Sequence, residues 1–155
     1  MYAVGKIKKI VCAIDGSEYS LRAGLRSVDL AQSLSAELTL IHVASYPARY
    51  YGLGEHTLPL GIPVEDKQVE RLKQSALDVM EKISSVARNT SILVSTEVLT
   101  TESSIAEEIV TYSLNRSIDL IAIGIKGLNE FQRSLVGSIA TEVVEKANCS
   151  VIVVR

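Results

Sequence analysis

The chain has 155 residues, of which 47% are hydrophobic and 22% charged, and its formal net charge is −2. This balance is typical of one globular domain and excludes a disordered or strongly basic chain. We therefore expect a single domain over 1–155 that does not bind nucleic acid. No apolar run approaches the roughly 20 residues of a membrane span, and no export signal is recognisable, so a cytoplasmic protein without membrane contact is expected.

Short apolar segments alternate with segments of helical period along the chain. In chain order, strands are predicted at 7–14, 37–44, 91–99, 119–123 and 150–154, and helices at 18–34, 66–88, 104–116 and 138–147. The segments 119–123 and 150–154 are almost wholly apolar, and runs that are apolar on both faces are typical of strands covered by helices on both sides. This order predicts an α/β fold, an open, doubly wound, Rossmann-like five-stranded parallel sheet with helices on both faces.

One long connection interrupts the alternation. All three prolines and three of the nine glycines fall within 45–64. A connection of this length is a lid or partner contact, or a loop without a task, and the sequence leaves these readings equal. Ligands of doubly wound sheets bind at the carboxyl ends of strands, so binding residues are expected after positions 14, 44, 99 and 123.

The segment after the fourth predicted strand combines a glycine-rich loop with a helix start. Its spaced residues are Gly124, Gly127, Gly137 and Ser138. Glycines let the backbone approach a ligand, and a helix N-terminus attracts negative charge. Lys126 and Arg133 add cations, so the segment predicts a phosphate site. The simpler alternative is that the glycines only turn the chain and that Ser138 only caps the helix.

Asp15 follows the first predicted strand, where its carboxylate could accept hydrogen bonds from ribose hydroxyls or an adenine amine. A turn or helix-capping role fits equally well, because Gly16 and Ser17 follow it directly. Val43, near the end of the second predicted strand, could line an adenine pocket. Taken alone, Val43 would be assigned to the core.

Over nearly its whole length the sequence resembles the universal stress protein family. The resemblance rests on IVCAIDGS at 10–17, LTLIHV at 38–43, IDLIAIG at 118–124 and ANCSVIVVR at 147–155. The ATP-binding branch of that family carries the pattern G-x2-G-x9-G-[S/T], and Gly124, Gly127, Gly137 and Ser138 complete it. The sequence departs from the usual family pattern in two places, at Ile125 in the glycine loop and over the segment 99–102.

The resemblance implies a bound adenine nucleotide, either ATP or one of ADP and AMP, with Mg²⁺ or Mn²⁺ as an accompanying metal. Gly127, Gly137 and Ser138 would hold the triphosphate, with a backbone N–H from Ile139. Asp15 would lie beside the ribose and adenine. The remaining residues expected around the base and loop are Ala13, Val43, Ile123 and Gly124. No catalytic residue is implied, and the residues that would ligate a metal are left unassigned.

The favoured function is a regulatory module that couples nucleotide binding to a stress or metabolic response through an unknown protein partner. The alternative is a slow ATPase or phosphotransferase using the same site, although the chain lacks a Walker lysine motif. A phosphorelay receiver would need an acidic pair after the first strand, where Asp15 stands alone. A flavodoxin-like site would need a phosphate loop rich in threonine and serine there, whereas Asp15 and Glu18 make this segment anionic, which would repel phosphate.

The last predicted strand ends the sequence and is wholly apolar from 151 to 154. An apolar strand at the edge of a sheet exposes unpaired backbone groups. Two-fold pairing with a second copy would cover them, which agrees with the family's usual dimer. We therefore expect a homodimer through 149–155, the alternative being a central strand in a monomer.

Overall fold

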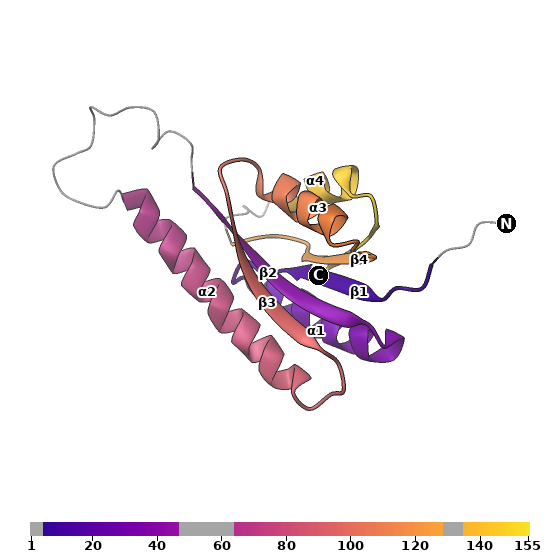
Figure 1. The fold of residues 1–155 in the computed structure, drawn as a ribbon. Helices are drawn as coiled ribbons and strands as arrows, with labels where there is room; N and C mark the ends of the chain where they lie inside the picture. The colour runs from indigo at the N-terminus through magenta and orange to yellow at the C-terminus, as the bar shows by residue number, and fades with distance from the viewer. Residues whose placement is uncertain (1–4, 47–63, 129–134) are drawn as a thin grey trace.

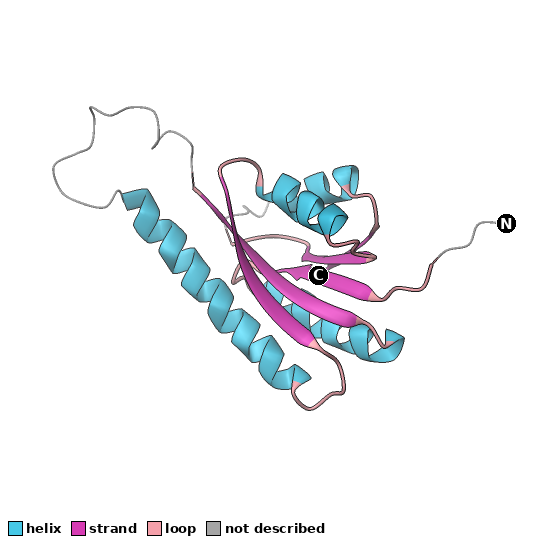
Figure 2. Cartoon of the chain, viewed as in Figure 1, coloured by secondary structure: helices cyan, strands magenta, loops and turns pink. Residues whose placement is uncertain are grey.

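The computed structural model describes residues 5–46, 64–128 and 135–155. Strands and helices alternate along the chain, as Figures 1 and 2 show. The strands are β1 (Lys9–Ala13), β2 (Glu37–Ser45), β3 (Val94–Thr101), β4 (Leu120–Gly124) and β5 (Ser150–Val154). The helices are α1 (Glu18–Leu34), α2 (Val64–Ala87), α3 (Ile105–Asn115) and α4 (Ser138–Lys146). None of these helices is long and apolar enough to cross a lipid bilayer.

All neighbouring strands are parallel, and the sheet order is β3-β2-β1-β4-β5. β2 and β3 follow one another on one side of β1, and the chain then crosses over so that β4 and β5 lie on the other side of β1. The direction of winding therefore reverses between β1 and β4, which confirms the predicted doubly wound fold.

The two faces of the sheet carry separate halves of the core. Alternate residues of the central strands point to opposite faces, so Cys12 and Leu40 pack with α1 and α2, whereas Val11 and Ile41 pack with α3 and α4. Figure 1 shows α1 and α2 on one side of the sheet and α3 and α4 on the other. Helices thus pack on both faces of the sheet, and the three central strands β2, β1 and β4 are the most deeply buried.

The boundaries of β3 differ most from the prediction, since the strand runs from Val94 to Thr101 rather than over 91–99. The apolar residues Ile92 and Leu93, just before Val94, are not part of the strand, and Leu93 is 70% exposed. As an edge strand, β3 is held by its register with β2, from Leu38 opposite Val94 to Ser45 opposite Thr101. Polar residues are tolerated along it because one face is largely open to solvent.

β5 occupies the other edge of the sheet, next to β4. Its residues from Val151 to Val154 are only half-buried, although all four are apolar. β5 therefore has the edge position that a dimer through this strand requires. The predicted dimer through 149–155 remains a prediction, and most of the 45–64 connection lies outside the described residues.

Candidate functional site

A cavity of about 620 Å³ opens at the carboxyl ends of the central strands, where the winding reverses. Its size is within the range of small-molecule sites. All nine residues predicted to bind nucleotide lie in its wall: Ala13, Asp15, Val43, Ile123, Gly124, Gly127, Gly137, Ser138 and Ile139. These residues come from β1, β2, β4 and α4 and the loops that follow the strands, so the fold brings together segments more than 120 positions apart.

Gly124, the first glycine of the loop, has a packing role in addition to lining the cavity. A Cβ atom at this position would lie 2.8 Å from the Tyr19 carbonyl carbon and 3.0 Å from Ser20 N. Both are backbone atoms at the start of α1, so they have little room to move aside. Glycine at 124 therefore lets β4 and α1 approach closely at the edge of the site.

The loop after β4 is closed at its base by backbone hydrogen bonds. Ile125 N donates to Val154 O at 2.7 Å, and Gly137 N donates to Ile125 O, also at 2.7 Å. The Ile125 side chain is 6% exposed, which explains an apolar residue where the family pattern favours a polar one. Both ends of the glycine loop are thereby fixed, and Lys126 and Gly127 are held at the cavity. The predicted cation Arg133 lies outside the described residues.

α4 begins at the cavity wall. Gly137 is its N-cap residue, and because it has no side chain it makes no side-chain capping bond. Ser138 is the first helical residue, directly beside the cap as predicted. The first turn of the helix, including Ile139, therefore presents its N-terminal end to the cavity, where the helix dipole favours negative charge.

The Asp15 carboxylate links the turn after β1 to the glycine loop. One oxygen, Oδ1, accepts a hydrogen bond from Ser17 N at 2.9 Å, and Oδ2 accepts one from Leu128 N at 3.1 Å. Gly16, between Asp15 and Ser17, has a φ of +89°, a conformation that favours glycine. Asp15 thus makes the turn contact of the simpler reading and also lines the cavity. A carboxylate accepts about four hydrogen bonds, so these two leave capacity for a ligand.

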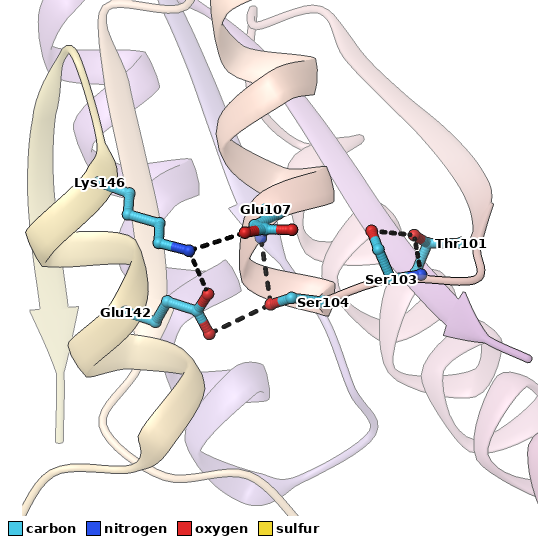
Figure 3. A network of polar contacts seen from close by, with 6 residues as sticks. All are labelled: Thr101, Ser103, Ser104, Glu107, Glu142 and Lys146. Carbon is cyan, nitrogen blue, oxygen red and sulfur yellow. Dashed lines mark hydrogen bonds and ion pairs between the residues drawn. The ribbon is translucent and has the colours of Figure 1, made fainter. Parts of the chain in front are cut away.

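A polar network joins the start of α3 to the middle and end of α4 (Figure 3). Ser104 caps α3 by accepting from Glu107 N, and its hydroxyl donates to Glu142 Oε2 at 3.1 Å. Lys146 Nζ donates to Glu142 at 2.7 Å and to Glu107 at 2.8 Å. The lysine lowers the pKa of Glu142, and the two carboxylates raise the pKa of Lys146. The network therefore holds α4 against α3, and with it the first turn of α4 that lines the cavity.

The rim after β3 is also polar and ordered by hydrogen bonds. Thr101 is buried, and its Oγ1 accepts from Ser103 N at 3.1 Å (Figure 3). Its carbonyl accepts from Tyr46 N at 2.9 Å. The segment 99–102, where the sequence departs from the usual family pattern, is thus mostly part of β3, which runs to Thr101 at the rim of the cavity.

Several cavity residues were not predicted as ligand contacts. They are Ile14, Ser20, Ile41, His42, Ala44, Ser45, Val69, Leu72, Ile105, Ile109, Leu128 and Ala140, and Lys126 was predicted only as an available cation. Those from α1, α2 and α3 reach the cavity through tertiary packing, which leaves no local sequence pattern. His42 lies in β2, one position before the predicted Val43.

No group of three or more histidine, cysteine, aspartate or glutamate side chains with the geometry of a metal site occurs in the described ranges. Cys12 is buried, and burial raises its pKa to about 12, so this thiol is a core residue rather than a nucleophile.

The sequence and the fold both have known relatives. A family model described as the universal stress protein family matches residues 6–155. Universal stress protein MJ0531 of Methanocaldococcus jannaschii is 31% identical over 151 residues, covering 96% of this chain and 82% of the relative. The solved structure of universal stress protein UspA from Lactobacillus plantarum is 27% identical and superposes with a TM-score of 0.80, covering 98% of this chain and 100% of that one.

More distant relatives with the same fold have been solved with adenine nucleotides. One from Archaeoglobus fulgidus is in complex with dAMP, with 21% identity, a TM-score of 0.62 and coverage of 96% of this chain and 98% of that one. The matched model spans nearly the whole chain, and the strand order and helix placement agree with solved members. The chain belongs to the universal stress protein family.

Proposed function

We propose that this chain is a regulatory module that binds ATP, or ADP or AMP, and passes its nucleotide state to a protein partner in a stress or metabolic response. One observation carries the proposal: the complete glycine pattern and Asp15 line one cavity at the point where the sheet reverses its winding. This is the place where doubly wound folds bind nucleotides. The dAMP complex of a family relative adds support.

The phosphates belong at the start of α4. Gly127, Gly137 and Ser138 line this part of the cavity, and the helix N-terminus supplies the positive end of a dipole. The half-buried Lys126 is in the same wall and adds a full positive charge. We assign Mg²⁺ or Mn²⁺, where present, to the phosphates of the nucleotide.

The adenosine belongs over β1 and β2. Asp15 retains free lone pairs for a ribose hydroxyl after its two backbone contacts. The side chains of Ala13, Val43 and Ile123 give this part of the cavity an apolar wall suited to a base. The proposal therefore orients the nucleotide across the strand ends, with the phosphates at β4 and the base at β2.

Assembly as a homodimer through 149–155 is part of the same proposal. The half-buried apolar residues of β5 lie at an open sheet edge, where a two-fold copy would cover them. Light scattering should give a mass twice the 16.8 kDa of one chain at micromolar concentration. A mass of one chain would contradict the dimer and leave the nucleotide site untouched. The proposal places the module in the cytoplasm.

Isothermal titration with ATP tests the function. The wild-type protein should bind, and Gly127→Val should abolish binding because its side chain would occupy the phosphate part of the cavity. Gly5→Ala is a matched control, since no atom lies within 4 Å of the added methyl group. Failure of ATP, ADP and AMP to bind at millimolar concentration would refute the proposal. Phosphate release above roughly 1 s⁻¹ that Gly127→Val removes would favour the ATPase alternative.

A further inference from the structure

The helix α4 is held at its end and at its start by different contacts. Lys146 Nζ donates to Glu107 of α3 at 2.8 Å and ties the end of α4 to that helix (Figure 3). The starts of α1 and α3 are capped by the side chains of Ser17 and Ser104. Gly137 has no side chain with which to cap α4, so the start of this helix depends on backbone contacts.

The backbone contact at the start of α4 is the hydrogen bond from Gly137 N to Ile125 O, at 2.7 Å. The N–H group of Gly137 is therefore engaged within the protein rather than directed at a phosphate oxygen. The donors for a ligand belong to the first turn of the helix, before Thr141, whose N–H makes the first bond within the helix, to Gly137 O at 3.0 Å. Gly137 accordingly orients these donors and does not add one of its own.

Ile125 is in turn fixed by the edge strand β5. Its N–H group donates to Val154 O at 2.7 Å, which continues the pairing of β4 with β5 one residue beyond Gly124, the partner of Val154 in the register. The Val154 side chain is half-buried and packs against the half of the core that α1 and α2 cover. A chain of hydrogen bonds thus runs from β5 to the start of α4, from Val154 through Ile125 to Gly137.

We propose that Val154 and Ile125 are positioning residues of the phosphate site, through which β5 holds the first turn of α4 ready to receive phosphate. Neither of these two described residues lines the cavity, so both act through Gly137. Donors bind an anion best when their positions are fixed before it arrives. Loss of the hydrogen-bond chain should therefore weaken the binding of the phosphates and leave the binding of base and ribose unchanged. This inference rests on the proposed nucleotide site and names the contacts that shape its phosphate end.

Two substitutions of Gly137 test the chain, because its φ of −68° and ψ of 156° suit both alanine and proline. Both variants add a Cβ atom, but only Gly137→Pro lacks the N–H group that donates to Ile125 O. Isothermal titration on the full chain compares ATP with adenosine, which carries the base and ribose without phosphates. We expect ATP to bind Gly137→Pro about fivefold more weakly than Gly137→Ala, the value of one hydrogen bond, and adenosine to bind both variants equally.

The outcomes of this comparison separate the inference from the proposed function. Equal ATP affinities of the alanine and proline variants would overturn the positioning role. So would a proline variant that loses ATP and adenosine affinity to the same extent, since that is the result of a general distortion of the cavity. Failure of the wild-type chain to bind ATP, ADP and AMP would overturn the proposed function and this inference with it.

A measurement on the wild-type chain alone covers the case in which these variants do not fold or do not bind. Amide hydrogen exchange, read by NMR, is compared between the nucleotide-free and the ATP-saturated protein. ATP should slow exchange at Gly137, and also at Ile125, whose N–H group touches β5 rather than the ligand. The internal control is Leu38, whose N–H donates to Leu93 O at the opposite end of the sheet and reports the general gain in stability on binding. Slowing at Ile125 that is no greater than at Leu38 would overturn the inference.

Discussion

Gly124→Ala tests whether the first glycine of the loop is needed for packing or for ligand contact. The added Cβ would lie 2.8 Å from the carbonyl carbon of Tyr19, 2.9 Å from Tyr19 Cβ and 3.0 Å from Ser20 N. Cβ atoms in proteins essentially never approach another heavy atom closer than 3.0 Å. Since two of these atoms belong to the backbone of α1, relief requires that β4 and α1 move apart.

The expected size of the effect follows from two opposing terms. Overpacking of a core typically costs about 1–3 kcal/mol. Replacing glycine by alanine in a strand recovers about 0.5–1 kcal/mol of backbone entropy. We therefore expect a net loss of roughly 1–2 kcal/mol, which for a domain of this size lowers Tm by about 2–8 °C.

Urea denaturation of the nucleotide-free protein measures this loss, with Gly5→Ala as the control. Nothing lies within 4 Å of the methyl group added at Gly5, so its free energy of unfolding should stay within about 0.5 kcal/mol of wild type. If Gly124→Ala is as stable as the control but loses ATP affinity, the close approach of Tyr19 is not what requires glycine at 124, and the packing argument fails.

Two further predictions concern stability. The pKa of His42 is lowered in the folded state by burial, so the unfolded chain takes up a proton near pH 6.5 before the folded chain does. The contribution of His42 to the free energy of unfolding should be fully present above pH 6.5 and should fall below it, by at most about 1.4 kcal/mol per pH unit. Urea denaturation between pH 7.5 and 5.5 measures this dependence, and His42→Asn should abolish it. Ser104→Ala removes the cap of α3 and the contact with Glu142, so it should cost about 1 kcal/mol in the same assay. Ser104→Thr, which keeps a hydroxyl group, should remain near wild type, and equal losses in both variants would contradict the capping role.

The fold was predictable because its signals are local. Alternating apolar strands and periodic helices specify the doubly wound class, and the spacing from Gly124 to Ser138 marks one strand, one loop and one helix start. The edge strand β3 was predicted less well because its boundaries depend on pairing with β2 rather than on its own apolar residues. Its exposed Leu93 shows that an apolar residue next to a strand need not belong to it.

The candidate site was predictable where a motif or the family resemblance marks its residues, and was missed where its residues lie in ordinary helical positions. Val69 and Leu72 reach the cavity from the long helix α2, and Ile109 reaches it from α3. None of the three is part of a motif, and each reads as an ordinary core position of an amphipathic helix. The unpaired Nε2 of His42 was not predictable either, because the protonation of the ring nitrogens depends on the hydrogen bond between Nδ1 and the carbonyl oxygen of Ile14, 28 positions earlier.

The contact between Asp15 and Leu128 spans 113 positions and gives the site a last testable property. Asp15→Asn keeps one acceptor for Ser17 N, but an amide NH₂ directed at Leu128 N–H would set donor against donor. The loss of this hydrogen bond, worth about 1 kcal/mol, should raise amide exchange at Leu128 roughly fivefold in the nucleotide-free protein. Hydrogen exchange with mass spectrometry measures this, and peptides from the middle of α3 serve as the internal control. Unchanged exchange at Leu128 would mean that Asp15 does not hold the glycine loop, and that only a bound ligand engages its second oxygen.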